Sequence, residues 1–291
     1  MKVSTSISSA GAFLMGVSLA PAALLIDVSV AGLGAGSAPS TLTNSGSVPG
    51  DFNLVNQAGQ PAPVIEVVGG VPGIHLNREQ AAQNVFKGPI TPNSLTLAGA
   101  SRSIEVWGHN PSGGTGEEMM VGWGRRGGPD GTNMSFGWTD QGAFGAVGQW
   151  GGGPDVPWGS GGAERPPVGD NLFHHLVYTY DGNDVGLFVD GISVFTETVG
   201  AIDTHDGFSF VIGGQNAQNA PHDVTVDGVG AGSFGGNFRG LINTVRIHDV
   251  ALSGAEVTAA FNAGPAVLIP EPAGMSLLAL GLVGLLFRRR R

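Results

Sequence analysis

The chain contains no cysteine, and only 12% of its 291 residues carry charge. The first absence excludes disulfides, thiolate metal sites and cysteine nucleophiles, although it does not fix the cellular compartment. Basic residues number 13 against 23 acidic ones, which gives a formal charge of -10. Because phosphate binding needs a basic surface, this balance argues against nucleic acid as a partner.

Glycine and proline are abundant instead, at 51 and 18 residues. With 41% hydrophobic residues and a mean hydropathy of +0.14, the chain is too apolar for charge-driven disorder. The glycines follow no three-residue period, so a collagen helix is excluded. Short apolar runs between glycines indicate a β-sheet protein with many tight turns.

The N-terminus has the order of parts expected of a secretory signal peptide. Lys2 precedes a serine-rich stretch, an apolar segment over 10–19 and the small-residue pattern Ala20-Pro21-Ala22. We therefore expect residues 1–22 to be a signal peptide. The alternative is that this segment forms a strand of the folded domain.

The segments at the C-terminus form a more specific pattern than those at the N-terminus. Pro270-Glu271-Pro272 precedes an uncharged apolar stretch over 273–287, and Arg288, Arg289, Arg290 and Arg291 end the chain. Fifteen residues of helix reach about 22 Å, less than the roughly 30 Å hydrocarbon core, so insertion needs local thinning of the bilayer. These parts together resemble the PEP-CTERM sorting tail of exported bacterial proteins. The resemblance implies an exosortase-type processing enzyme, transient insertion of 270–291 into the inner membrane, and release to the surface or matrix. A plain membrane anchor is the alternative.

Trimming at both ends leaves a body over about 23–269. Its net charge is about -14, because the ends remove five basic residues and one acidic residue from the total. Alternating apolar residues predict a series of short strands. They lie at 24–30, 64–68, 94–97, 102–107, 119–123, 135–138, 143–150, 176–180, 185–189, 192–196, 208–212 and 238–248.

Four local features make more specific predictions. Asp190-Gly191 joins two strands and suits a type I′ hairpin turn, in which both residues need positive φ. The apolar parity of 238–248 changes near Asn243-Thr244, which predicts a β-bulge there. Ser253 and Glu256 form a capping box that begins one short helix, and Gly264 ends it. The strand at 24–30 is expected to pair antiparallel with 238–248, with Leu25 or Ile26 buried against Ile247, because jelly rolls commonly seat the first strand beside the last.

Three stretches resemble the LamG-like, concanavalin A-like jelly roll. They are 103–107 (Ser-Ile-Glu-Val-Trp), 173–182 continuing to 187–191, and 240–247 followed by 251–253 and Glu256. Phe173 replaces the family's usual tryptophan, and Asn243 and Thr244 stand where the family tends to have acidic residues. The ten or more short strands, the one short helix and the regular spacing of turns predict a sandwich or jelly roll by themselves. The resemblance spans about 100–264, and at most 24–264, and implies that this sandwich is all-β with two antiparallel sheets. We therefore expect a jelly-roll domain over 23–264 with one short C-terminal helix, a linker at 265–269 and a terminal apolar helix in the tail. The resemblance implies little about activity, because this fold serves lectins, adhesive modules and enzymes alike.

Catalytic patterns are weak. A retaining glycosidase needs two carboxylates about 5 to 5.5 Å apart, and the Glu-x-Asp-x-x-Glu pattern of laminarinase-like glycoside hydrolases of this fold class is missing. Adjacent Glu117 and Glu118 would point to opposite faces of a strand, and Glu105 has no acidic neighbour two residues away. No nucleophile elbow is present, and we expect one of His174 and His175 to pack inside while the other faces solvent.

Calcium is the one metal that the resemblance makes plausible, through oxygen-rich loops. Asp130 and Asn133 are the candidate ligands, with a second such loop at 203–206. Calcium takes six to eight oxygens, and these loops supply few from side chains alone. Ordinary turn chemistry is the alternative explanation for the loops.

The tryptophans are the best binding candidates. Trp123, Trp138, Trp150 and Trp158 fall within 36 positions among glycine-rich loops, and exposed indole rings can stack on sugars. The alternative places the first three in the core and leaves Trp158 exposed in its loop. Nearby Arg125 and Arg126 could bind an anionic sugar or tie down their own loop.

Together these features predict an exported, non-catalytic module at the cell surface or in the extracellular matrix. We expect it to bind a polysaccharide or a surface protein. A passive matrix protein and, faintly, a glycoside-active enzyme are the alternatives.

Overall fold

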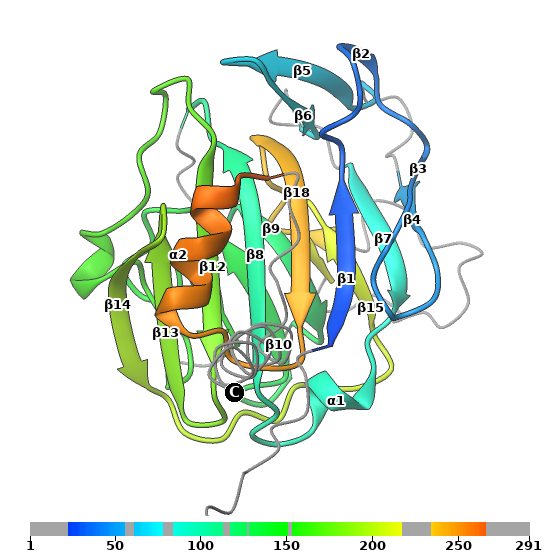
Figure 1. Ribbon diagram of the computed structural model, residues 1–291. Coiled ribbons are helices and arrows are strands. Elements are labelled where there is room, and N and C mark those ends of the chain that lie inside the picture. The colour runs from blue at the N-terminus through cyan, green and yellow to red at the C-terminus, as the bar shows by residue number, and fades with distance from the viewer. Residues whose placement is uncertain are drawn as a thin grey trace, which may run out of the picture. The chain divides into compact units, whose positions relative to one another are not determined.

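The computed structural model describes residues 23–55, 61–77, 84–112, 117–126, 128–150, 153–216 and 234–265. Within these ranges two antiparallel sheets pack face to face, as Figure 1 shows. This confirms the predicted all-β sandwich. The predicted signal peptide and sorting tail lie outside the described residues.

The larger sheet has nine strands, and β18 lies near its middle between β8 and β6. The first strand, β1, also pairs with β18. In order the sheet contains β14 (Ile192–Thr198), β13 (Asp184–Val189), β12 (His174–Tyr180), β8 (Arg102–His109), β18 (Leu241–His248), β6 (Val71–His75), β5 (Val64–Val68) and β2 (Gly36–Ser37), with β1 (Leu24–Ser29) beside β18.

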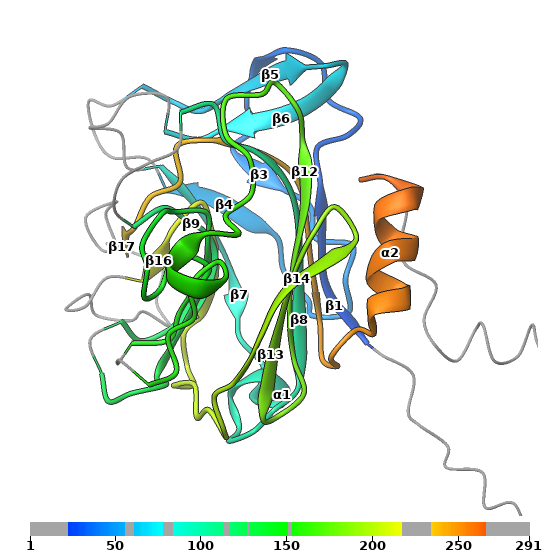
Figure 2. The same cartoon turned by 90° about the vertical axis from the view of Figure 1, so that its left-hand side faces the viewer.

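The smaller sheet has seven strands and faces the larger one across the core. A two-stranded pair, β16 (Gln215–Asn216) with β17 (Phe234–Gly235), lies beside it in Figure 2. The smaller sheet runs in the order β11 (Val147–Gly148), β10 (Asn133–Gly137), β9 (Met119–Gly124), β15 (Ser209–Ile212), β7 (Val85–Ile90), β4 (Phe52–Val55) and β3 (Thr41–Leu42).

Aromatic side chains join the two sheets. The rings of Phe136 on β10 and Tyr178 on β12 lie 6.3 Å apart across the sandwich, and both side chains are fully buried. Trp123 on β9 packs edge-on against Phe210 of β15, with ring centroids 5.5 Å apart. Large buried rings remove much apolar area from water, so this layer stabilises the sandwich.

The predicted hairpin and bulge are both confirmed. Asp190 and Gly191 have φ of 51° and 78°, as a type I′ turn between β13 and β14 requires. The register of β18 against β8 shifts between Ile242 and Thr244, which places the extra residue at Asn243.

The predicted closure of the sheet by its first strand is also confirmed. β1 runs antiparallel to β18, and Ile26 lies opposite Ile247 with both side chains at 0% exposure. Through this pairing the strand-prone residues after position 23 form part of the larger sheet.

Helix α2 (Gly254–Ala263) begins at the predicted capping box. Ser253 accepts from the backbone N–H of Glu256, whose side chain accepts in return from the backbone N–H of Ser253. Figure 2 shows α2 lying on the outer face of the larger sheet. Its residues Val257 and Ala260 pack with Val177 and Phe188 of the sheet.

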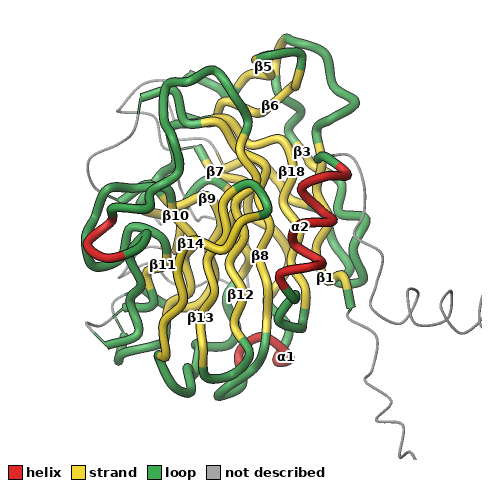
Figure 3. The backbone as a smooth tube through the Cα atoms, turned by 60° about the vertical axis from the view of Figure 1, so that its left-hand side comes forward, coloured by secondary structure: helices red, strands yellow, loops and turns green. Residues whose placement is uncertain are grey.

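Two predicted strands are wrong. Residues 94–97 belong instead to a single helical turn, α1 (Asn93–Thr96), which begins after Pro92 and buries Leu95. Of the segment 143–150 only β11 pairs as a strand, because a turn that closes between Gln141 and Gly145 takes up its first part. A 3-10 turn, η1 (Ser160–Gly162), follows; Figure 3 shows it as a short red segment, within a green loop, beside β10 and β11. No helix of the described residues is long and apolar enough to cross a membrane.

Candidate binding surface

Three of the four candidate tryptophans are core residues. Trp123, Trp138 and Trp158 each have 0% exposure. The indole N–H of Trp158 donates to the carbonyl of Gly137 at 3.2 Å, and its ring packs 5.8 Å from that of Phe136. The expected exposure of Trp158 is therefore wrong: its loop folds over the end of the smaller sheet and carries the ring inside. These three buried rings therefore cannot stack on a sugar at the surface.

Trp150 differs from the other three because it is only half-buried. Its backbone lies in the left-handed region, with φ of 58°. The guanidinium carbon of Arg126 lies 5.2 Å from the centre of its ring, within cation–π range. The structure therefore brings together two of the residues that the sequence singled out, while Arg125 is exposed beside them.

Arg126 is also held from its other side. Its Nη2 donates to Oε1 of Glu117 at 2.6 Å, and both side chains are about three-quarters buried. Oε2 of Glu117 accepts from Nε2 of Gln215 at 3.0 Å, and Oε1 of Gln215 accepts from Nδ2 of Asn133 at 2.9 Å. A continuous polar chain thus runs from the buried face of β10 to the surface at Trp150. We call Trp150, Arg126, Glu117, Gln215 and Asn133 the Trp150 cluster.

Sequence reasoning missed Glu117 and Gln215 as members of this cluster. Glu117 was considered only as half of an acidic pair, and the structure places its neighbour Glu118 elsewhere, fully buried and 3.5 Å from Nε of Arg239. Gln215 lies 98 positions after Glu117, so no local pattern could have joined them.

A third carboxylate, Asp155, lies beside the cluster. Its Oδ1 accepts from the backbone N–H of Gln149 at 2.6 Å. Burial, reinforced by the negative charges of Asp130 and Glu117, raises the pKa of Asp155 to about 6. On the opposite side, the N–H of Gly131 donates to the carbonyls of both Gln149 and Trp150.

The expected calcium ligands do not converge. Asp130 is exposed, whereas Asn133 is buried. The side-chain amide nitrogen of Asn133 donates hydrogen bonds to Ser135, Gly148 and Gln215. The two oxygen-rich loops do meet, since Thr132 and residues 203–206 line one concavity of about 300 Å³. Among the described residues no group of three acidic or histidine side chains could hold a metal.

The two adjacent histidines are both buried, so the expectation that one faces solvent is wrong. His174 contacts carboxylate oxygens of Asp190 and Asp170 at 2.7 and 2.8 Å. His175 contacts one oxygen of Glu105, and His248 of β18 contacts the other. Although burial alone would raise the pKa of Glu105, these two histidines lower it to about 2. Phe261 of α2 stacks on Trp107, and Trp107 on His175, which covers this part of the sheet.

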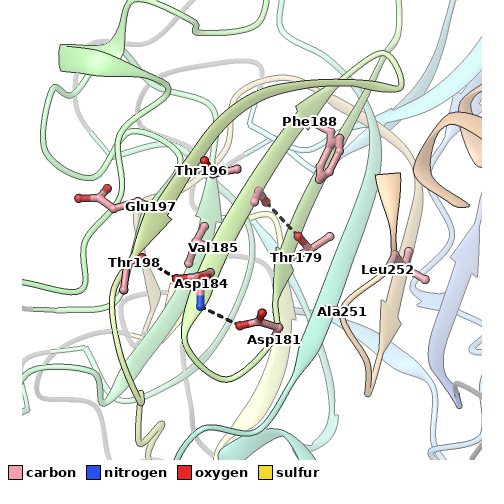
Figure 4. Close-up of a pocket in the computed structure, with 11 residues that line it drawn as sticks. Thr179, Asp181, Asp184, Val185, Phe188, Thr196, Glu197, Thr198, Ala251 and Leu252 are labelled. Atoms are coloured by element: carbon pink, nitrogen blue, oxygen red, sulfur yellow. Dashed lines mark hydrogen bonds between the residues drawn. The ribbon is translucent and has the colours of Figure 1, made fainter. Parts of the chain in front are cut away.

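A second concavity of about 470 Å³ lies on the outer face of the larger sheet (Figure 4). Its lining mixes threonine hydroxyls, carboxylates and apolar side chains. Asp181 accepts from the backbone N–H groups of Asn183 and Asp184, and Asp184 accepts from the hydroxyl of Thr198 at 2.6 Å. These bonds belong to the turn between β12 and β13, so the carboxylates have a structural role already. We call this concavity the β13 groove; its lining residues are Thr179, Asp181, Asp184, Val185, Gly186, Phe188, Thr196, Glu197, Thr198, Ala251 and Leu252.

Residues 86–258 match the family model of the Concanavalin A-like lectin/glucanases superfamily. Residues 268–291 match the PEP-CTERM protein-sorting motif, which confirms the resemblance of the tail and implies export and sorting to the cell surface. No curated protein matches the chain.

Solved structures resemble the chain at low sequence identity. Domain 4 of AbnA, a GH43 extracellular arabinanase from Geobacillus stearothermophilus, in complex with arabinotriose, matches with a TM-score of 0.52 and 18% identity over 82% of this chain and 98% of that domain. The binding domain of Paraclostridial Mosquitocidal Protein 1 gives 0.48 and 14%, over 83% of this chain and 52% of that one. A Trypanosoma rangeli sialidase gives 0.47 and 15%, over 82% of this chain and 32% of that one. At these identities the likeness concerns the fold alone.

Proposed function

The chain belongs to the concanavalin A-like lectin/glucanases superfamily, and on that premise we propose that it is an exported, non-catalytic module that binds an extracellular polysaccharide through the Trp150 cluster. The sorting motif at 268–291 supports processing by an exosortase-type enzyme, brief membrane insertion and delivery to the surface or matrix. A surface protein as ligand is the second reading of the same module.

The observation that carries this proposal is the state of Trp150. It is the one of the four candidate tryptophans that is not fully buried, and the guanidinium carbon of Arg126 lies 5.2 Å from the centre of its ring. An aromatic ring held by a salt-bridged arginine loses little conformational entropy on binding, so stacking on a sugar costs less than with a mobile ring. Arg126 beside it uses Nη2 to bind Glu117, and the other N–H groups of its guanidinium are the proposed donors to sugar hydroxyls.

The carboxylates support a binding role over catalysis. Glu105 is buried and both of its oxygens contact histidines, and Glu117 is paired with Arg126. A retaining glycosidase would need two accessible carboxyl groups facing one another. The fold itself is shared by glycosidases and binding domains, and the arabinanase domain of the same fold is a complex with arabinotriose. That complex makes neutral oligosaccharides a sensible first set of probes.

The test is a glycan array probed with the full chain in mild detergent, followed by calorimetry on any ligand found. Trp150→Ala should weaken binding about five- to thirtyfold, because stacking on one ring contributes about 1–2 kcal/mol. Ile192→Ala, which removes a side chain that is 68% exposed on β14, is the matched control and should bind like the wild type.

Three outcomes separate the alternatives. Binding that is retained in Trp150→Ala would show that the site lies elsewhere, and Thr196→Val in the β13 groove would then be the next variant to test. No binding to any glycan, with a folded protein, would leave the passive matrix role. Release of reducing ends from a polysaccharide would overturn the non-catalytic reading.

A further inference from the structure

Trp150 adopts a backbone conformation that needs support. A φ of 58° is in the left-handed region, which tryptophan rarely adopts because its Cβ crowds the following carbonyl. A residue remains there only where its surroundings hold it, and such positions gather at functional sites. The direction of the Trp150 ring therefore depends on whatever fixes its backbone.

Two groups form hydrogen bonds to the backbone of Gln149 and Trp150. The N–H of Gly131 donates to the carbonyl of Trp150 at 3.0 Å and to that of Gln149 at 2.9 Å. Oδ1 of Asp155 accepts from the N–H of Gln149 at 2.6 Å, and its carboxylate also interacts with the N–H of Trp150. Gly131 has no titratable side chain, so Asp155 is the one of these two groups whose hydrogen bonds to this backbone can change with pH.

We propose that Asp155 is the positioning residue for Trp150, and that its ionisation sets whether the ring is held in place for a ligand. The consequence for affinity rests on the proposed function, but the positioning itself does not. An ionised carboxylate accepts N–H bonds more strongly than a neutral one. The bonds to the N–H groups of Gln149 and Trp150 favour the ionised form, so for a carboxyl group that stays buried they hold the ring more firmly when Asp155 carries its charge, even though burial makes that charge costly for the fold as a whole.

The surroundings of Asp155 place this change near neutral pH. Burial is the largest cause, because it disfavours the charged form, and the negative charges of Asp130, on the turn after β9, and Glu117, just before β9, add to its effect. Arg126 is the basic group next to them, but it is already paired with Glu117. Arg125 is exposed to solvent. The pKa of Asp155 is consequently about 6, so a fall from pH 7 to pH 5 discharges it.

The experiment follows the ring itself, using the full chain with 5-fluorotryptophan in place of its five tryptophans and 19F NMR from pH 4.5 to 8. Trp150→Phe identifies the Trp150 signal by its disappearance. In the wild type that signal should shift with a midpoint near pH 6. In Asp155→Asn it should not shift in this range, while the other four signals stay where they are and report an intact fold.

Asp130→Asn is the matched control, because it removes a nearby charge without touching the bonds to Gln149. Its midpoint should fall below that of the wild type, since one repulsive charge is gone. A Trp150 signal that does not move with pH, or one that still titrates in Asp155→Asn, overturns the proposal. The measurement uses no ligand, so a clean titration with no glycan binding would reject the proposed function and leave the positioning role standing.

Discussion

Ile26 on β1 lies directly opposite Ile247 on β18, and both side chains are fully buried. The first and last strands of the sandwich therefore depend on one another. Ile26→Ala should lower the free energy of unfolding by about 2–5 kcal/mol, because it opens a cavity in the core. Chemical denaturation measures the change, with Val67→Ala, at a side chain that is 48% exposed, as the control.

Deleting residues 23–30 tests the contribution of the whole strand β1. Loss of β1 uncovers the apolar edge of β18, and we expect aggregation, read by size-exclusion chromatography. A soluble deletion variant that melts cooperatively at the wild-type temperature would show that β1 is dispensable.

The hairpin turn makes a second prediction. Gly191 has φ of 78°, and a Cβ there would lie 3.1 Å from Cβ of Phe261 on α2. Gly191→Val should cost about 1–2 kcal/mol from backbone strain, with more from displacement of α2. Gly200→Val separates the two contributions, because Gly200 has a similar φ of 75° but open space around it. Equal melting temperatures for Gly191→Val and the wild type would mean that the turn is of another type.

Asp155 makes a prediction about stability as well as position. Its pKa is raised in the folded state to about 6, so the folded protein binds more protons than the unfolded chain between about pH 4 and 6. Ionisation of Asp155 therefore removes stability as the pH rises through this window. Asp155→Asn should melt at a higher temperature than the wild type at pH 7, and the difference should close toward pH 4. Scanning calorimetry across this range checks the sign; a variant less stable at pH 7 would contradict it.

The pKa of Glu105 is shifted in the opposite direction to that of Asp155, so its effect on stability has the opposite dependence on pH. Its pKa is lowered to about 2, so its contribution is present above the ordinary carboxyl pKa and is lost as the pH falls toward 2. Glu105→Gln should cost roughly 3 kcal/mol at pH 7, because two hydrogen bonds to a charged acceptor are weakened. The loss should shrink as the pH falls below 4. Thermal melts at pH 7 and pH 3 compare the two; a constant loss would show that packing, not charge, explains it.

The sorting tail makes a prediction about the mature protein. If an exosortase-type enzyme cuts near Pro270-Glu271-Pro272, surface material from the native host lacks Arg288, Arg289, Arg290 and Arg291. Intact-mass measurement reads this directly. A full-length C-terminus on surface material would favour the plain membrane anchor.

Local patterns were enough for several elements of the fold. Asp190-Gly191 predicts its turn because two neighbouring residues satisfy the steric needs of positive φ by themselves. The capping box at Ser253 and Glu256 is likewise complete within four residues. The parity change at Asn243 predicts a bulge because one face of β18 must remain apolar.

The position of the tryptophans could not be read in this way. Trp150 and Trp158 lie in the same glycine-rich stretch, yet Trp150 is partly buried and Trp158 is fully buried. Composition is the same for both, and the difference arises from how the loop crosses the end of the smaller sheet. The same reason explains α1, where burial of Leu95 accompanies a helical turn in a stretch whose residues favour a strand.

The sequence by itself determined the hairpin, the bulge and the series of strands, because each is encoded in neighbouring residues or in apolar periodicity. It indicated the closing pair of strands through the usual arrangement of jelly rolls, and the sorting tail through its resemblance to a known motif. Only the tertiary structure decided which polar groups meet. Glu117 and Gln215, 98 positions apart, and Glu105 and His248, 143 positions apart, come together through the pairing of strands. Hydrogen bonds and charge interactions act over a few ångströms, so their partners are fixed by the folded path of the chain and not by its order.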